Sequence, residues 1–106
     1  MMLKLEYSSQ FKKNFKKIAK LPIPDVVEVG HVIKQLQLDN PLPEKYVDHL
    51  LSGNWQDYRD CHVKPDLVLI YKADEIYLRL ARIGTHSELF RYQRRVNGDW
   101  VRWRLF

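Results

Sequence analysis

The sequence predicts an α+β fold in which an amino-terminal strand and two helices precede a mostly antiparallel sheet of three or more strands. Apolar residues recur at helical spacing in the first third of the chain, whereas three runs typical of strands follow between residues 55 and 81. These runs are consecutive and closely connected, which favours antiparallel pairing. The length of 106 residues fits one domain.

The first strand and helix are expected at the amino terminus. Apolar and polar residues alternate over residues 3–7, as in a half-buried strand. Ser8 or Ser9 then caps a helix, because a serine oxygen can accept a free backbone N–H at a helix start. Apolar residues at spacings of four and three form the buried face of this helix. They are Phe11, Phe15 and Ile18.

The second helix is expected to begin at Asp25. Pro22 and Pro24 precede it and end the first helix, since proline lacks the N–H donor. Its apolar stripe consists of Val26, Val29, Ile33 and Leu36. His31 lies off this stripe and is expected on the surface without a role. The proline-containing segment 39–43 ends the helix and begins a long loop.

The three sheet strands are expected over residues 55–63, 67–71 and 76–81. The middle run is apolar throughout, which is typical of a central strand covered on both faces. Cys61 is the only cysteine, so no intrachain disulfide can form, and it is expected in the core.

The last sixteen residues, 91–106, form a basic and aromatic extension. They contain five arginines and one aspartate, and so most of the net charge of +5. Asn97-Gly98 is a preferred two-residue turn, so an extra hairpin on the sheet edge is one interpretation. Nucleic-acid binding by the arginines and aromatic rings is a second, and a poorly ordered extension is a third.

The composition also bears on location. No uncharged stretch approaches the roughly 18 residues that a membrane helix needs, and charges interrupt the amino terminus where a signal peptide would be apolar. With a single cysteine, this predicts a reducing cytoplasm and no membrane partner. A basic chain favours a polyanionic partner, without choosing between RNA, DNA, lipid and an acidic protein.

Three of the four histidines lie near the ends of predicted strands, where they could converge. They are His49, His62 and His86, accompanied by Asp60, Asp66 and Arg82. A metal site is one interpretation, but no two ligands have the tight spacing of a metal-binding pair, and no metal is predicted. Cys61 and His62 are adjacent on a strand and point to opposite faces, which argues against a cysteine nucleophile.

Metal-free RNA cleavage suits this set of residues better. The 2′-hydroxyl must lose a proton to attack the phosphate, and the leaving 5′-oxygen must gain one. Histidine, with an unperturbed pKa of about 6.5, can do both near neutral pH. Arginine can stabilise the charge that gathers on the phosphate, and an aromatic ring can hold a base by stacking.

Four motifs resemble the YafQ branch of the RelE-type toxins, in the RelE/ParE superfamily of type II toxin–antitoxin systems. They are YSxQFKK at residues 7–13, DHLLSGNW at 48–55, YRDCHVKPDLVLIY at 58–71 and RIGTHSELF at 82–90. The resemblance covers residues 1–90, which would form one RelE-like toxin domain. It departs at Leu67, where relatives often have tryptophan, a change that could alter base stacking, and in the extension 91–106, which has no counterpart.

The resemblance implies a ribosome-dependent mRNA interferase that cleaves mRNA in the A site without metal or cofactor. It also implies a cognate antitoxin that neutralises the toxin and carries it to operator DNA. Carried over by position, the catalytic group is His49, His62, Asp66 and His86, with Asp66 as general base and His86 as general acid. Arg82 and Phe90 would support this group as phosphate- or RNA-binding residues. Apart from the resemblance, Asp60 and four lysines on the polar side of the first helix are also expected to bind RNA, with a solvated helix side as the alternative for the lysines. They are Lys12, Lys13, Lys16 and Lys17.

Three alternatives stay open. A RelE-fold protein could bind and inhibit another enzyme, although such a protein would not need the histidine set. A catalytically inactive member could act only as a corepressor bound to its antitoxin. A nuclease acting on free RNA is disfavoured, because the small positive charge of residues 1–90 makes unaided RNA binding weak.

Overall fold

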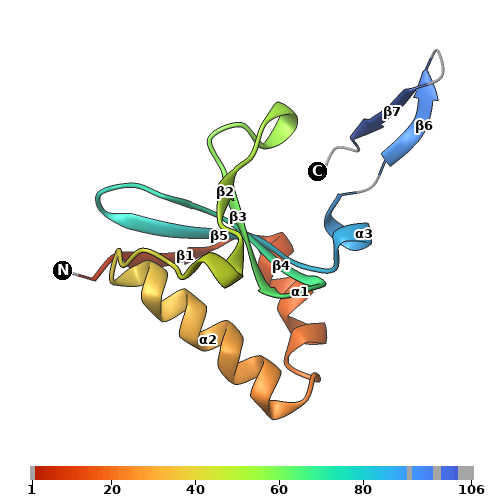
Figure 1. Cartoon of the computed structure of the whole chain (residues 1–106). Coiled ribbons are helices and arrows are strands. Elements are labelled where there is room, and N and C mark those ends of the chain that lie inside the picture. Colours follow the sequence, from red (N-terminus) through yellow and green to blue (C-terminus); the bar gives the residue numbers. More distant parts are fainter. Residues whose placement is uncertain (1, 91, 97–98, 103–106) are drawn as a thin grey trace.

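The computed structural model describes residues 2–90, 92–96 and 99–102. Five strands form one sheet in the order β1-β5-β4-β3-β2, and helices α1 and α2 lie on one side of it (Figure 1). The helical elements are α1 (Ser9–Ile18), α2 (Ile23–Gln37), η1 (Glu44–Tyr46), η2 (Gly53–Trp55) and α3 (His86–Leu89). The strands are β1 (Lys4–Tyr7), β2 (His49–Leu50), β3 (Arg59–Lys64), β4 (Leu67–Ala73), β5 (Tyr77–Gly84), β6 (Tyr92–Val96) and β7 (Asp99–Arg102).

The pairing confirms the expected α+β class with a mostly antiparallel sheet. Strands β2 to β5 pair antiparallel with their neighbours, while β1 pairs parallel with β5 at the edge. The central position of β4 is also confirmed, because all five residues from Leu67 to Tyr71 are buried.

The start of α1 follows the expected capping. The Ser8 hydroxyl accepts a hydrogen bond from the backbone N–H of Phe11, so Ser8 is the N-cap. The same hydroxyl donates to the carbonyl of Ala81 on β5 at 2.6 Å and fastens the helix start to the sheet. Phe11 and Ile18 are buried against the sheet.

Helix α2 differs from the expectation at its start and on its buried face. It begins at Ile23, not at Asp25, because proline is tolerated in the first turn, where its missing N–H would have no helical partner. The buried residues of the helix are Val29, Val32 and Leu36. The expected stripe missed Val32, which is fully buried.

Strand β3 begins at Arg59, not at residue 55 as expected. Trp55 ends the short helix η2, is 1% exposed, and packs edge-on against Tyr58 with the ring centroids 4.9 Å apart. The backbone N–H of Leu51 donates to the carbonyl of Tyr58 and closes the loop between them. Burial of the indole therefore overrides the local strand pattern. β5 is longer than expected and runs to Gly84.

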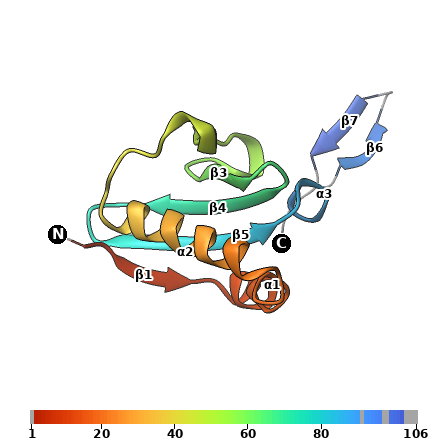
Figure 2. The same ribbon diagram turned by 60° about the horizontal axis from the view of Figure 1, so that its bottom comes forward.

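The sheet separates two apolar clusters. The cluster under α1 and α2 contains Cys61, Val63 and Leu69, which confirms Cys61 as a core residue. Figure 2 shows α2 running along one face of the sheet. A second cluster lies on the other face of the sheet. It consists of Leu51, Trp55, Val68, Ile70, Ala81, Leu89 and Phe90.

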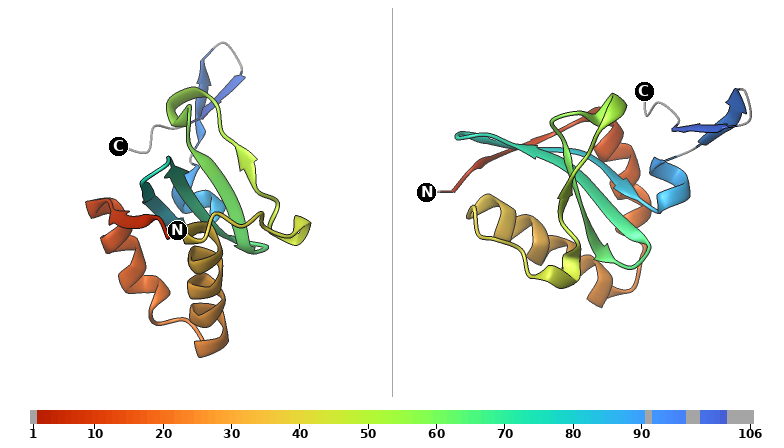
Figure 3. Two further views of the ribbon diagram at one scale, coloured as in Figure 1. Left: turned by 90° about the vertical axis from the view of Figure 1, so that its left-hand side faces the viewer. Right: turned by 45° about the horizontal axis from the view of Figure 1, so that its top comes forward.

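Strands β6 and β7 pair with each other in antiparallel fashion and are separate from the five-stranded sheet (Figure 3). The described part of the extension is thus a strand pair of its own, not a further strand on the sheet edge. The expected Asn97-Gly98 turn lies outside the described residues. Across the described ranges, the structure has no helix that is long and apolar enough to cross a membrane.

Candidate active site

The register of the sheet brings the predicted site residues to one end of one face. Across β3, β4 and β5, His62 lies opposite Val68, and Val68 lies opposite Gly84. β5 ends at Gly84, and α3 begins two residues later with His86. On the other side of β3, His49 of β2 is the register partner of Asp60.

The three histidines form a row with His62 in the middle. The rings of His62 and His86 are in edge-to-face contact, with centroids 4.8 Å apart. The His49 and His62 centroids are 6.5 Å apart. The convergence that the sequence left open is therefore present in the fold, and we refer to these three residues as the histidine row.

His49 is oriented by two acceptors. Its Nδ1 atom lies 2.9 Å from the carbonyl oxygen of Val47 and 3.0 Å from Oδ1 of Asp60. Both partners accept hydrogen bonds, so Nδ1 carries the proton and Nε2 is left for a reacting group. The sequence analysis expected Asp60 to contact RNA. Asp60 is 3% exposed in the structure, so it positions His49 instead.

His86 is paired with Asp66 at the other end of the row. Oδ1 of Asp66 lies 3.1 Å from the backbone nitrogen of His86 and 3.3 Å from its Nδ1. The hydrogen bond from the backbone N–H is the main reason why the pKa of Asp66 is lowered, and the His86 ring adds to it. Asp66 is therefore a carboxylate within hydrogen-bond reach of the His86 ring and backbone. Both side chains reach the solvent.

Helix α3 holds His86 through a capping box. The Thr85 hydroxyl accepts from the backbone N–H of Glu88, and the Glu88 carboxylate accepts from the backbone N–H of Thr85. A Cβ atom on Gly84 would come within 2.9 Å of this carboxylate, so a larger residue there would displace the Glu88 side chain from the capping box.

Residues 3–91 match the family described as "Bacterial toxin of type II toxin-antitoxin system, YafQ". The chain belongs to the YafQ toxin family. The mRNA interferase toxin YafQ of Escherichia coli K12 is 43% identical over 88 residues, which cover 81% of this chain and 94% of that protein. The family resemblance read from the sequence is therefore confirmed.

Solved YafQ-like structures share the fold. A metal-bound toxin from Helicobacter pylori is 43% identical, with a TM-score of 0.76 over 84% of this chain and all of that one. The E. coli DinJ–YafQ toxin–antitoxin complex gives 39% identity and a TM-score of 0.72, covering 84% of this chain and 98% of that one. In the part of this chain that the structure describes, no three His, Cys, Asp or Glu side chains form a group that could hold a metal.

Arg82, Phe90 and Leu67 each make contacts within the protein. The Arg82 guanidinium donates to Oδ1 of Asn14 on α1 at 2.7 Å, which holds it beside that helix. Phe90 is 4% exposed, with its ring centroid 6.0 Å from that of His86, so it supports His86 and offers no open face to a base. Leu67 is buried in the cluster under the helices, away from the histidine face.

The four lysines expected to bind RNA are exposed on α1. They are Lys12, Lys13, Lys16 and Lys17. Nζ of Lys17 lies 3.3 Å from Oε2 of Glu88, which links this helix to the capping box before His86. The lysine face is thus next to the end of the histidine row that His86 occupies.

Two supporting residues escaped the sequence analysis. Asn14, on α1, also accepts from the backbone N–H of Ile83. Asp48 accepts from Nε of Arg59 at 3.1 Å and from the hydroxyl of Tyr71 at 2.7 Å, so it ties the residue before His49 to β3 and β4. Burial, together with this hydrogen bond, raises the pKa of Tyr71. The position of Asp48 next to a candidate histidine was the only signal available in the sequence.

Proposed function

We propose that this protein is an endoribonuclease that cuts mRNA in the ribosomal A site by metal-independent acid–base catalysis. The observation that carries this proposal is the histidine row, in which His62 lies between two histidines that are each held by a carboxylate. The E. coli relative is named an mRNA interferase, and family membership supports the same reaction here.

The reaction is a transesterification within the RNA. A base removes the proton of the 2′-hydroxyl, whose oxygen attacks the adjacent phosphorus, and the bond from phosphorus to the 5′-oxygen breaks. An acid gives that oxygen a proton, and a 2′,3′-cyclic phosphate is left. Base and acid work on opposite sides of the phosphorus in such an in-line displacement.

This geometry favours different roles from those carried over with the resemblance. Asp66 and His86 lie within hydrogen-bond reach of each other, and so on one side of any phosphate between the histidines. We therefore assign the acid to His86 and make Asp66 the group that positions it. His49, with Nε2 unprotonated, is the base at the other end. His62 is left to donate to the phosphate oxygens.

The same proposal covers the partners. The E. coli relative has been solved with the antitoxin DinJ, so a cognate antitoxin is expected for this chain, with operator DNA bound only through that complex. The exposed lysines of α1 would contact ribosomal or messenger RNA, since such contacts are electrostatic and independent of sequence. Action on ribosomes takes place in the cytoplasm, so we propose that compartment for this protein.

The test is cleavage of mRNA on ribosomes programmed with a defined A-site codon. Protein treated with EDTA is assayed with and without ribosomes, next to His86→Ala and the control His31→Ala, which changes an exposed histidine on α2. Cutting only on ribosomes by wild type and the control, with none by His86→Ala, is expected. A folded wild type that never cuts would favour the corepressor alternative, and removal of residues 91–106 would show whether the extension blocks the site.

A further inference from the structure

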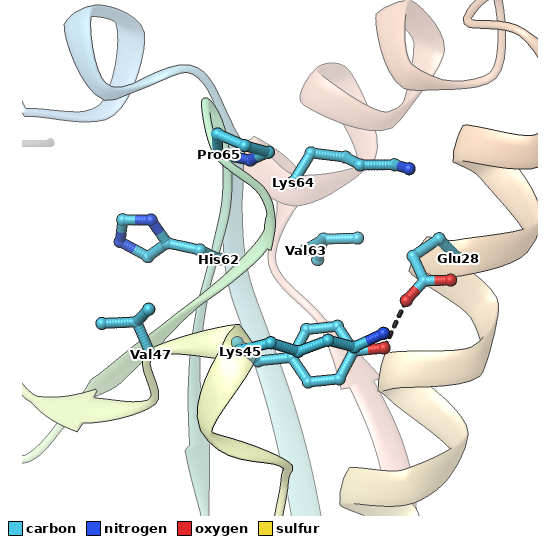
Figure 4. Close-up of a pocket in the computed structure, with 8 residues that line it drawn as sticks. Glu28, Lys45, Val47, His62, Val63, Lys64 and Pro65 are labelled. Carbon is cyan, nitrogen blue, oxygen red and sulfur yellow. Dashed lines mark hydrogen bonds between the residues drawn. The ribbon is translucent and has the colours of Figure 1, made fainter.

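A cavity of about 510 Å³ adjoins the histidine row between the end of β3, η1 and α2. Figure 4 shows His62 at one end of the cavity and Glu28 of α2 at the other. The volume is in the range of sites that take small organic ligands. His62 therefore belongs to the histidine row and also lines the cavity beside it.

Two lysines extend along this cavity toward α2 (Figure 4). Nζ of Lys64 lies 3.4 Å from Oδ1 of Asp25, and both side chains are partly exposed. Nζ of Lys45 lies 4.9 Å from the centre of the Tyr46 ring. An exposed ion pair contributes little free energy, so an incoming anion can replace Asp25 at little cost.

The carboxylate in the cavity already has a partner. The Tyr46 hydroxyl donates to Glu28, which lowers the pKa of Glu28 and raises that of Tyr46 to about 12. At neutral pH the carboxylate is thus ionised and hydrogen-bonded by a neutral phenol. The lining groups that carry charge are two ammonium groups and the Glu28 carboxylate, and Asp25 beside the cavity pairs with Lys64. An anion that displaces Asp25 from Lys64 would therefore meet two ammonium groups and one carboxylate, a net positive charge.

The cavity and the histidine row also share a strained residue. Val47 lines the cavity, and its carbonyl is the acceptor that orients His49. Its φ of 49° is in the left-handed region, which β-branched residues rarely adopt. Strain of this kind persists where the surrounding structure holds it and is concentrated at functional sites.

We propose that the cavity binds the nucleotide next to the cleaved linkage, with its phosphodiester on Lys45 and Lys64. This inference rests on the proposed function, because an RNA chain that crosses the histidine row continues on either side of the cut. Phosphate contacts fix the register of a nucleic acid without reading its sequence. The cavity therefore sets where the chain lies, and the histidines cut it.

The experiment is a double-mutant cycle between the protein and the RNA. Lys45→Gln/Lys64→Gln is compared with wild type and with Lys4→Gln/Lys34→Gln, which removes two exposed lysines that do not line the cavity. Each is assayed on programmed ribosomes whose mRNA carries an uncharged methylphosphonate at one or other linkage beside the cut.

One methylphosphonate position is expected to lower kcat/KM of the wild type and control about tenfold, as for the loss of one charged hydrogen bond. On ordinary mRNA, the kcat/KM of Lys45→Gln/Lys64→Gln should be lower than that of the wild type by the same factor. On the substituted mRNA, its kcat/KM should fall no further. The proposal would be overturned if the two changes lowered kcat/KM independently, so that their factors multiply. It would also be overturned if neither methylphosphonate changed kcat/KM of the wild type.

If the wild type cuts no mRNA, the proposed function is wrong, and the cavity is then tested by direct RNA binding. Isotope-labelled protein is then titrated with a 2′-O-methylated RNA trinucleotide. Shifts of the Val47 and His62 amides that are absent in Lys45→Gln/Lys64→Gln would support the cavity site by itself. Their absence in wild type would overturn it.

Discussion

The two faces of the sheet are built from the same strands but carry different side chains: one packs under the helices, and the other holds the histidine row. On β3, Cys61 and Val63 point under the helices and are almost completely buried. Asp60 and His62 point to the opposite face, where His62 belongs to the histidine row and Asp60 is the carboxylate beside His49. Side chains alternate along a strand, so one short strand serves both faces. The comparison indicates that stability and chemistry can be changed separately in this protein.

The largest separable effect is expected on the histidine face. His86→Ala should lower kcat by about 10²–10⁴, the usual contribution of a general acid. Its side chain is half exposed, so the free energy of unfolding should change little. Single-turnover cleavage and urea unfolding of the same preparation measure both quantities. Loss of activity with an equal loss of stability would mean that the two faces are not independent.

The converse change is made under the helices. Leu69 is fully buried on β4, so Leu69→Ala should lower the free energy of unfolding by about 2–5 kcal/mol. Well below its unfolding midpoint, the variant should cut at nearly the wild-type rate, because Leu69 contacts the cluster opposite the histidines. A slow variant that is fully folded would contradict this.

The third prediction separates His49 from Asp66 as the base. His49→Gln should lower the single-turnover cleavage rate by about 10²–10⁴, the usual contribution of a general base. Asp66→Asn should lower the rate less, because the pKa of Asp66 is already below its ordinary value of 3.8 and so weakly basic a carboxylate is a poor base at neutral pH. The single-turnover rates of both variants decide the matter, and a larger loss in Asp66→Asn would restore Asp66 as the base.

A smaller effect is expected at the strained turn. Val47 is about half exposed, so glycine there loses little packing and adopts the positive φ without strain. Val47→Gly should raise the free energy of unfolding by about 1 kcal/mol. Thermal or urea unfolding measures it, with Val27→Gly on exposed α2 as a control that should destabilise. A less stable Val47→Gly would show that the turn is unstrained.

The smallest effect is a pH dependence of stability at Asp66. Its folded pKa is lowered, so its contribution is fully present above the ordinary value of 3.8 and is lost as the pH falls through the lower folded value. The stability difference between wild type and Asp66→Asn should be constant from neutral pH down to about 5 and shrink below 4. A difference that instead grew on acidification would reverse the sign of this linkage.

The sequence predicted the fold where local and global signals agree. The alternating first strand, the Ser8 cap and the apolar β4 are all as expected. The predicted start of β3 was wrong, because the burial of Trp55 depends on the second apolar cluster, which no local sequence pattern reveals. At the site, strand register gathers the three histidines, so their positions at strand ends were informative. The partners Asn14 and Asp48 depend on contacts between distant elements, and the burial of Asp60 and Phe90 does as well.

The parallel pairing of β1 with β5 joins the two ends of the toxin domain. Residues 4–7 lie against residues 77–80, and the Ser8 hydroxyl reaches the carbonyl of Ala81. Contacts so far apart in the chain form late in folding, because a long loop must close first. During synthesis, the first strand must wait for β5 to leave the ribosome. A nascent chain, or one terminated before β5 is complete, would therefore have neither a complete sheet nor His86. Activity is thus expected only after the whole domain has been synthesised and folded.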